Sequence, residues 1–389
     1  MTFVDEVSIR EKRILLRVDF NVSLTPNRAI ADDMRIRQSL PTIQHLLRNG
    51  NRLILISHLD RPEGFDPKLS LQPVRDRLQQ YLPQYPIHLV ADFTKDKNLL
   101  TTQKPEDIVL LENIRFYAGE VQNDPNFAKQ LAQLGDVYVN EAFSVSHRKE
   151  ASIVTLPQLL PSYGGLLLKD EIMMLKKGLE NPTRPLVAIV GGSKISTKIK
   201  FIDKLMDLAD FLLIGGGLAN NFLAAQGYAI GKSIVEQNER ETTEALLKQQ
   251  WTKRAKLLLP LDAVCGNPID RATPGMPLAL QDIPPEAMIL DIGQNTQKLF
   301  ANAIQQARTI IWNGPVGYIE NPQYISGTDA IYEAVIANSE AISIVGGGDT
   351  LASLALKPDL HKISHISTGG GAMLSFVEEG TLPGIQALR

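Results

Sequence analysis

The run RILLRVDF (residues 13–20) sets the pattern on which the fold of this 389-residue chain depends. Its apolar centre, from Ile14 to Leu16, is continuous rather than alternating, which is typical of a parallel strand covered on both faces. Similar runs recur with helix-length spacers: RLILISHL (52–59), DIVLLENI (107–114), DVYVNEAF (136–143), PLVAIVGG (185–192), DFLLIGGG (210–217), KLLLPLDAV (256–264), TIIWNGPV (309–316) and AISIVGGG (341–348). This succession predicts an α/β protein built on parallel sheets.

The length of the chain predicts two domains, because a single hydrophobic core stops growing near roughly 250–300 residues. Between Pro161 and Pro185 lies LLLKDEIMMLKKGLE (166–180), an amphipathic stretch bounded by prolines. Proline is well tolerated at the start of a helix but tends to kink or break a helix interior. We therefore expect a first domain over 1–165, an interdomain helix over 166–185 and a second domain over 186–374.

The composition excludes several classes of protein. Hydrophobic residues at 44% and charged residues at 21% describe an ordinary globular chain. The net charge of −3 argues against nucleic-acid binding. No apolar run approaches the roughly 18 residues of a membrane span, and the first residues, MTFVDEVSIREKR, contain no apolar signal core. A single cysteine, Cys265, cannot form an internal disulfide, so we expect a cytoplasmic protein.

Arginine and glycine are distributed unequally along the chain. The first 150 residues hold 13 of the 19 arginines, whereas 24 of the 28 glycines come later. Arginine grips phosphate and carboxylate groups in bidentate fashion, and glycine turns let a backbone approach a nucleotide. The high arginine content of the first part and the high glycine content of the second favour an anionic ligand on the first domain and a nucleotide on the second. Composition alone leaves open that arginine covers helix surfaces and glycine fills turns.

Position decides between these readings, since ligands bind beyond the carboxyl ends of strands in such sheets. In the first half the predicted strand ends carry polar side chains: Asp19, Asn21, His58, Arg61, Asn113, Arg115, Asn140, His147 and Arg148, with Arg35 after the first strand. Four arginines in one structural position predict an anion site. In the second half the strand ends are glycine turns, at 191–192, 215–217, 346–348 and 369–371 and within Asn313-Gly314-Pro315.

Two features of the glycine turns indicate phosphate chemistry. Lys194 and Lys198 lie four residues apart, on one face of a predicted helix start. Asp349 and Thr350 place a carboxylate and a hydroxyl at another helix start, which suits Mg²⁺ bound with phosphates. The chain contains no GxxxxGK[ST] loop and no GxGxxG fingerprint at these strand ends, so neither a P-loop enzyme nor a typical nicotinamide dehydrogenase is supported.

The motifs taken together resemble those of phosphoglycerate kinase. They occur in that family's order: RVDFNV (17–22), SHLDRP (57–62), LLENIRF (110–116), NEAFSVSHR (140–148), GGSKISTK (191–198), IGGGLANNF (214–222), WNGPVGYIE (312–320), VGGGDT (345–350) and STGGGA (367–372). The resemblance implies a monomer with two Rossmann-like domains separated by a cleft. It also implies 3-phosphoglycerate or 1,3-bisphosphoglycerate on the first domain and Mg-ADP or Mg-ATP on the second. LPGIQAL (382–388) resembles the tail that returns to the first domain in that family, here about 375–389.

The resemblance also assigns roles to individual residues. It implies that Asp19, Phe20, Asn21, His58, Leu59 and Asp60 contact the glycerate ligand, and that Arg35, Arg61, Arg115 and Arg148 hold its charges. It implies nucleotide contacts from Lys198, Gly293, Glu320, Gly347, Gly348, Asp349 and Thr350, with Asp349 serving magnesium and Glu320 the ribose. Arg35 and Lys194 would meet the phosphoryl group in transfer. That agrees with the residues themselves, since phosphoryl transfer needs mainly alignment and charge neutralisation.

Several positions depart from the family's usual pattern. Ser23 replaces a proline, Asp60 a glycine, and Gln294 a proline, while Glu141, Ser144 and Ser146 change the NDAFGTAHR loop. Every charged residue assigned to phosphate is present, so we expect the departures to affect affinity and loop geometry more than reaction type. The alternative is a catalytically weakened paralogue that binds the same ligands in a regulatory or scaffolding role. A nucleotide-dependent dehydrogenase ranks third.

Overall fold

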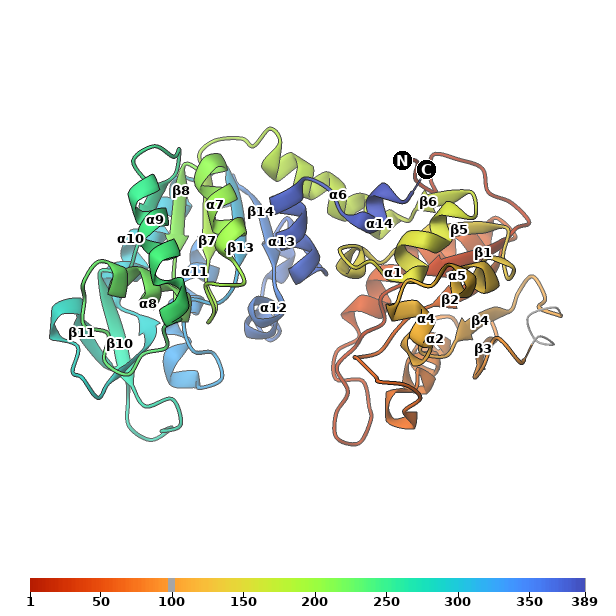
Figure 1. Ribbon diagram of the computed structural model, residues 1–389, viewed down its shortest axis with the longest axis horizontal. Helices are drawn as coiled ribbons and strands as arrows, with labels where there is room; N and C mark the ends of the chain where they lie inside the picture. Colours follow the sequence, from red (N-terminus) through yellow and green to blue (C-terminus); the bar gives the residue numbers. More distant parts are fainter. Residues whose placement is uncertain (97–101, 389) are drawn as a thin grey trace. The chain divides into compact units, whose positions relative to one another are not determined.

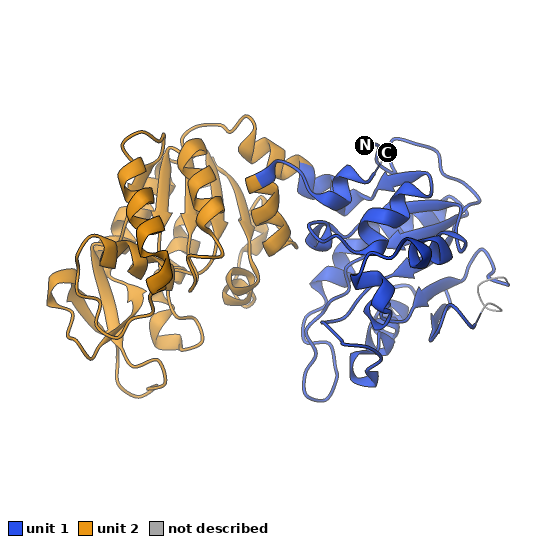
Figure 2. Ribbon diagram, in the orientation of Figure 1, with its two compact units in different colours: residues 1–172, 379–389 blue, residues 173–378 orange. Residues whose placement is uncertain are grey.

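The structure, a computed structural model, describes residues 1–96 and 102–388. The chain divides into two compact units, coloured separately in Figure 2. Unit 1 comprises Met1–Ile172 together with Glu379–Arg389, and unit 2 comprises Met173–Glu378. The end of the chain therefore belongs to the same unit as its beginning.

Unit 1 is built on a parallel sheet, which has six strands in its described part, in the order β3-β4-β2-β1-β5-β6 (Figure 1). The strands are β1 (Arg13–Arg17), β2 (Arg52–Ile56), β3 (Ile87–Val90), β4 (Ile108–Leu111), β5 (Val137–Asn140) and β6 (Ser162–Gly164). The helices include α1 (Met34–Arg48), α2 (Gln72–Tyr81), α4 (Ala118–Val121), α5 (Pro125–Ala132) and α14 (Pro383–Gln386). β1 and β5 are neighbours in this sheet, and the chain continues from β1 to β2 on one side and from β5 to β6 on the other. The segments that follow β1 and β5 therefore meet at the switch point, where such sheets bind ligands.

Unit 2 contains a second parallel sheet, with the order β15-β14-β13-β7-β8-β9 among the described residues. Its strands are β7 (Leu186–Val190), β8 (Phe211–Ile214), β9 (Lys256–Leu258), β13 (Thr309–Asn313), β14 (Ile342–Gly346) and β15 (His365–Ile366). Its helices include α7 (Ile199–Leu208), α8 (Gly216–Ala225), α9 (Arg240–Gln249), α10 (Gln294–Gln306), α11 (Ser326–Ala337), α12 (Gly348–Leu354) and α13 (Gly370–Glu379). The switch point lies between β7 and β13.

The run KLLLPLDAV forms two strands rather than one. β9 ends at Leu258, and β10 (Asp262–Gly266) joins β11 (Met276–Ala279) and β12 (Met288–Ile292) in a separate antiparallel sheet. Pro260 lies between the two strands, and proline interrupts a strand because it has no N–H to donate. The expectation of a single strand here was wrong.

The predicted fold class is confirmed, since each unit has a parallel-sheet α/β core. The apolar runs form buried strands, and all described residues of β4, β5, β7 and β13 are buried. Between the prolines, α6 spans Leu166–Leu179, and the division between the units falls within it. The short strands β3, β6 and β15 were not anticipated. Within the described residues, no helix is both long and apolar enough to cross a membrane.

Candidate active site

Asp19 is the centre of the polar cluster at the switch point of unit 1. Its carboxylate accepts a hydrogen bond from Nη1 of Arg35 at 2.5 Å, from the Asn21 backbone N–H at 2.9 Å and from the Ser144 hydroxyl. His58 Nδ1 lies 3.8 Å from Oδ1 of Asp19, the oxygen that accepts from Asn21. Burial alone would raise the pKa of Asp19, but the charge of Arg35, the nearby His58 ring and these hydrogen bonds hold that pKa well below its usual range. Asp19 is therefore ionised at neutral pH.

The loop that follows β2 is held in place by hydrogen bonds of its backbone and of the Ser57 side chain. The Ser57 hydroxyl accepts from the Phe20 N–H at 2.9 Å, and Asn113 donates from Nδ2 to the Leu59 carbonyl at 2.7 Å. Asp60 donates its N–H to Oδ1 of Asn21 at 2.8 Å. The side chains of Phe20 and Leu59 lie in the hydrophobic core, so only their backbones can face a ligand.

The predicted substrate arginines differ in how strongly they are already engaged. Arg115 is only 6% exposed; it donates from Nε and Nη2 to Oε1 of Glu150 at 3.2 and 2.7 Å, and from Nη1 to the Asp60 carbonyl at 2.8 Å. Arg61 is exposed and Arg148 half-buried, and neither guanidinium has a hydrogen bond or ion pair within the described part of the chain. Arg61 and Arg148 are thus the arginines most available to an anion.

Sequence reasoning missed the buried charges that lie beneath this site. Arg17 is fully buried and donates from Nε to the Ser152 hydroxyl at 2.9 Å, while its Nη2 lies 4.0 Å from Oε2 of Glu150. Burial raises the pKa of Glu120 to about 7, although Arg17 and Ser152 act in the opposite direction. An arginine within the apolar run RILLRVDF was the available signal. Its acidic neighbours are more than 100 residues away in the sequence.

The departures of the 140–148 loop have separate surroundings. Ser144 bonds to Asp19 directly, so it belongs to the polar cluster. Glu141 instead accepts a hydrogen bond at 3.2 Å from the N–H of Leu167, which lies in the first turn of α6. Burial raises the pKa of Glu141 to about 8.

Asp60, the departure in the loop after β2, is exposed, and no ion pair of its carboxylate is found among the described residues.

In unit 2, the turn after β7 and the loop after β13 are in direct contact. The Gly191 N–H donates to the Asn313 carbonyl at 3.0 Å, and the Gly192 N–H donates to the Pro315 carbonyl at 2.8 Å. A Cβ added at Gly191 would lie 2.1 Å from the Pro315 carbonyl oxygen, so only glycine fits there. The close contact brings the two loops together at the switch point of the second sheet.

The two predicted lysines of this turn have different environments. Lys198 Nζ donates to the carbonyl of Gly191 at 2.7 Å and lies 3.3 Å from that of Asn313. Burial lowers the pKa of Lys198 to about 8, and the charge of Asp349 opposes that shift. Lys194 is exposed. One lysine is therefore held against the two loops, while the other projects into solvent.

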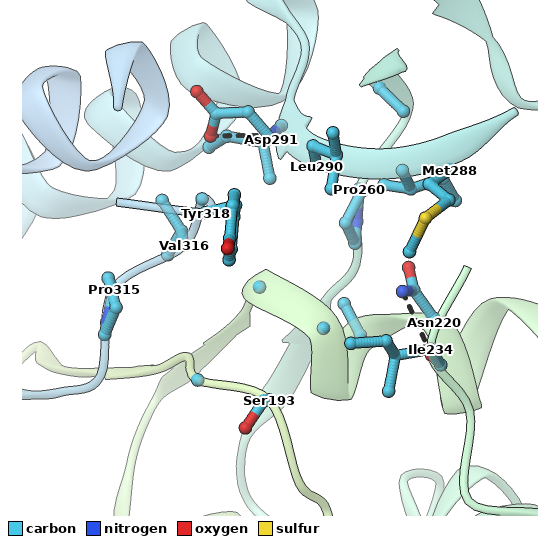
Figure 3. Close-up of a pocket in the computed structure, with 18 of the residues that line it drawn as sticks. Ser193, Asn220, Ile234, Pro260, Met288, Leu290, Asp291, Pro315, Val316 and Tyr318 are labelled. Atoms are coloured by element: carbon cyan, nitrogen blue, oxygen red, sulfur yellow. Dashed lines mark hydrogen bonds between the residues drawn. The ribbon is translucent and has the colours of Figure 1, made fainter. Parts of the chain in front are cut away.

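A pocket of about 900 Å³, counting its open mouth, lies beside these loops (Figure 3). Met288, Asn220 and Ile234 lie on one side of it, and Val316 and Tyr318 lie opposite. Its polar lining includes Ser193, Asn220, Asp262, Asp291, Glu320 and Asp349. An apolar cleft with a few polar groups and glycine turns at its edge has the character of a nucleotide site.

Of the predicted nucleotide residues, Glu320 and Asp349 line the pocket directly. Gly293 precedes α10 beside Asp262, another lining residue. Gly347, Gly348 and Thr350 form the start of α12, where the Thr350 hydroxyl accepts from the Gly314 N–H at 2.7 Å. The pocket residues Asn220, Asp262, Met288 and Asp291 were missed, because they come from α8 and the antiparallel sheet rather than from parallel strand ends.

The chemistry of the donors bears on the magnesium implied by the resemblance. The described residues contain no group of three or more His, Cys, Asp or Glu side chains arranged to hold a metal ion. Asp349 supplies an exposed carboxylate in the first turn of α12, where the negative charge also complements the helix dipole. This arrangement fits a metal that is held mainly by the phosphates of a nucleotide and only partly by protein.

The chain is similar in sequence and in fold to known proteins. The family model described as phosphoglycerate kinase matches residues 4–380. A phosphoglycerate kinase of Moorella thermoacetica is 45% identical over 386 residues, which cover 98% of each chain, and one of Thermosynechococcus vestitus is 44% identical over 382 residues, or 97% of this chain and 95% of that one. The solved phosphoglycerate kinase of Coxiella burnetii has a TM-score of 0.88 at 37% identity, covering 99% of this chain and 98% of that one. That of Pyrococcus horikoshii has a TM-score of 0.88 at 28% identity, covering 100% and 98%.

These similarities define a phosphotransferase whose acceptor is a carboxyl group. The match extends over nearly the whole chain and includes both units. The chain belongs to the phosphoglycerate kinase family.

Proposed function

We propose that this protein transfers the γ-phosphoryl group of Mg-ATP to the carboxylate of 3-phosphoglycerate, and catalyses the reverse transfer from 1,3-bisphosphoglycerate to Mg-ADP. The observation that carries the proposal is that each unit has a candidate anion site at the switch point of its sheet, and that the two sites differ in character. Unit 1 presents arginines around the ionised Asp19, and unit 2 presents glycine turns, lysines and a pocket with nucleotide character. The site of unit 1 suits a small trianion, and the site of unit 2 suits a nucleoside triphosphate.

In unit 1, Arg61 and Arg148 would hold the phosphate of the glycerate ligand, because their guanidinium groups are uncommitted. Arg35 is partly exposed and would turn toward the carboxylate end of the ligand. Asp19, Asn21 and neutral His58 would orient the hydroxyl and carboxylate. Burial lowers the pKa of His58 well below its usual value, and the nearby arginines reinforce that shift. Arg115 would contribute indirectly, because its hydrogen bond to the Asp60 carbonyl fixes the backbone of that residue.

In unit 2, the pocket would take the base, Glu320 at its edge would bind the ribose, and Lys198 with the start of α12 would bind the phosphates. The magnesium that travels with the nucleotide neutralises phosphate charge, and Asp349 would be its protein ligand. No protein nucleophile is needed. A carboxylate oxygen of 3-phosphoglycerate forms the new bond to the γ-phosphorus while the bond to the β,γ-bridging oxygen breaks, and ADP leaves. Lys194 and Arg35 would stabilise charge on the transferred group.

The two candidate sites belong to different units, so transfer would require the units to close. We further propose that the enzyme acts as a monomer in the cytoplasm, where its single, buried cysteine would stay reduced. The reaction is a step of glycolysis, and the same reversible chemistry would serve gluconeogenesis or carbon fixation.

A coupled assay of ADP release tests the proposal. ADP should appear only when ATP, Mg²⁺ and 3-phosphoglycerate are all present, and omission of any one of them should abolish the signal. Binding of both ligands without ADP release would instead favour the weakened paralogue. ADP release that does not depend on 3-phosphoglycerate would contradict the proposed acceptor.

A further inference from the structure

The position of Lys194 depends on the backbone that carries it. The side chain is exposed and has no hydrogen bond or ion pair within the described part of the chain. Its own carbonyl accepts from the Thr197 hydroxyl at 3.1 Å, and the turn closes with the Lys198 N–H donating to the Ile195 carbonyl at 2.8 Å. A flexible lysine can meet a phosphoryl group reproducibly only if this turn is fixed.

Glu236 fixes the residues directly after Lys194. Its Oε2 accepts from the Ser196 N–H at 3.0 Å and its Oε1 accepts from the Ser196 hydroxyl at 2.6 Å. Partial burial would raise the pKa of Glu236, but the hydrogen bonds from Ser196 and from the Ile195 N–H and the charge of Lys194 lower it below its usual value. A carboxylate that accepts from one turn in this way is a strong, charge-assisted tether.

The segment that carries Glu236 also lies against the wall of the pocket. The Glu236 N–H donates to Oδ1 of Asn221 at 2.9 Å, and Asn220 donates from Nδ2 to the Ile234 carbonyl at 3.2 Å. Asn220 and Ile234 both line the pocket, where Figure 3 shows them together. Residues 234–236 therefore connect the wall of the pocket to the turn that bears Lys194.

We propose that Glu236 is a positioning residue that holds the Ile195–Ser196 turn against the pocket wall and thereby places Lys194 for phosphoryl transfer. Glu236 itself touches neither substrate nor the reacting atoms. The inference rests on the proposed function, in which Lys194 meets the transferred group. Loss of the tether should leave nucleotide binding largely intact and should lower the rate of the chemical step.

The test is a double-mutant cycle on kcat in the coupled assay. Glu236→Gln replaces one acceptor oxygen with a donor and should lower kcat roughly 10- to 100-fold, with less than a twofold change in the KM for ATP. Ser196→Ala removes the partner hydroxyl without touching Glu236 and should lower kcat in the same direction. The control Glu241→Gln removes an equal charge from an exposed position of α9 and should leave kcat unchanged.

In a Lys194→Ala background, Glu236→Gln should have no further effect, because the residue to be positioned is gone. A purely structural role would give the full loss in both backgrounds and would overturn the inference. If both Glu236→Gln and Ser196→Ala keep wild-type kcat, the inference is also wrong. If Lys194→Ala alone keeps wild-type kcat, the role proposed for Lys194 fails, and the inference fails with it.

Discussion

Arg115 donates a hydrogen bond from Nη1 to the carbonyl oxygen of Asp60 at 2.8 Å. Because Asn21 accepts from the N–H of the same residue, Asp60 is held on both sides of its α-carbon. Its backbone is thereby kept at a φ of +55°, in the left-handed region that favours glycine. The glycine usual at this position in the family thus has a conformational reason, and the carboxylate of Asp60 is an addition to a loop that the proposed ligand-binding residues surround.

Replacing Asp60 separates the effect of its charge from that of its backbone. Asp60→Asn keeps the shape and tolerates positive φ, while Asp60→Gly also removes the backbone restriction. Both should lower the KM for 3-phosphoglycerate severalfold and leave the KM for ATP alone, because a repulsion of about 1 kcal/mol or less is relieved. The free energy of unfolding should change by less than about 1 kcal/mol. A raised KM for 3-phosphoglycerate in Asp60→Asn would mean that the carboxylate helps binding, and would refute this prediction.

Arg35 and Lys194 should both be needed for the chemical step. Arg35→Ala and Lys194→Ala should each lower kcat by roughly 10²–10⁵, by analogy with the loss of an arginine finger. Arg35 belongs to unit 1, so its loss should change ATP affinity far less than it changes kcat. Arg37→Ala is a matched control. Arg37 is an exposed arginine on the same helix as Arg35, and it forms an ion pair with Asp33. Comparable losses of ATP affinity and kcat in Arg35→Ala would contradict the assignment.

Nucleotide affinity should fall as the pH rises through the pKa of Lys198. Burial lowers that pKa to about 8, so the ammonium is charged at pH 7 and mostly neutral at pH 9.5. A neutral amine loses its attraction to phosphate, and the Kd for ADP measured by calorimetry should rise roughly tenfold over this range. Lys198→Ala should bind ADP weakly with little dependence on pH. An equally steep dependence in that variant would assign the titration to another group.

Phosphoryl transfer should be accompanied by closure of the two units. Ligands held on separate units can react only when the units bring them together, with a few hinge residues near α6 absorbing the change. Solution scattering should give a smaller radius of gyration with 3-phosphoglycerate and a non-hydrolysable ATP analogue together than with neither. An unchanged radius under verified double saturation would rule out closure.

The sequence predicted those parts of the molecule that depend on local pattern. Continuous apolar runs located the buried strands, and the residues predicted at strand ends, Asp19 after β1 and the glycine turn at 191–192 after β7, lie at the two switch points. It did not predict contacts between distant residues: Arg115 and Glu150 are 35 positions apart, and Arg17 and Ser152 are 135 apart. For the same reason, the sequence did not predict that α8 and β12 form part of the pocket wall, because no periodicity indicates which elements will share a cavity.

The central claim is that a carboxyl oxygen of 3-phosphoglycerate receives the phosphoryl group of ATP. The most direct measurement is trapping of the product with hydroxylamine, which converts an acyl phosphate into a hydroxamate and leaves a phosphate ester unchanged. With ATP, Mg²⁺ and 3-phosphoglycerate, wild-type protein should form hydroxamate and ADP in equal amounts, and Lys194→Ala should form both far more slowly. ADP formation without hydroxamate would show that water or a hydroxyl group is the acceptor, and would contradict the account.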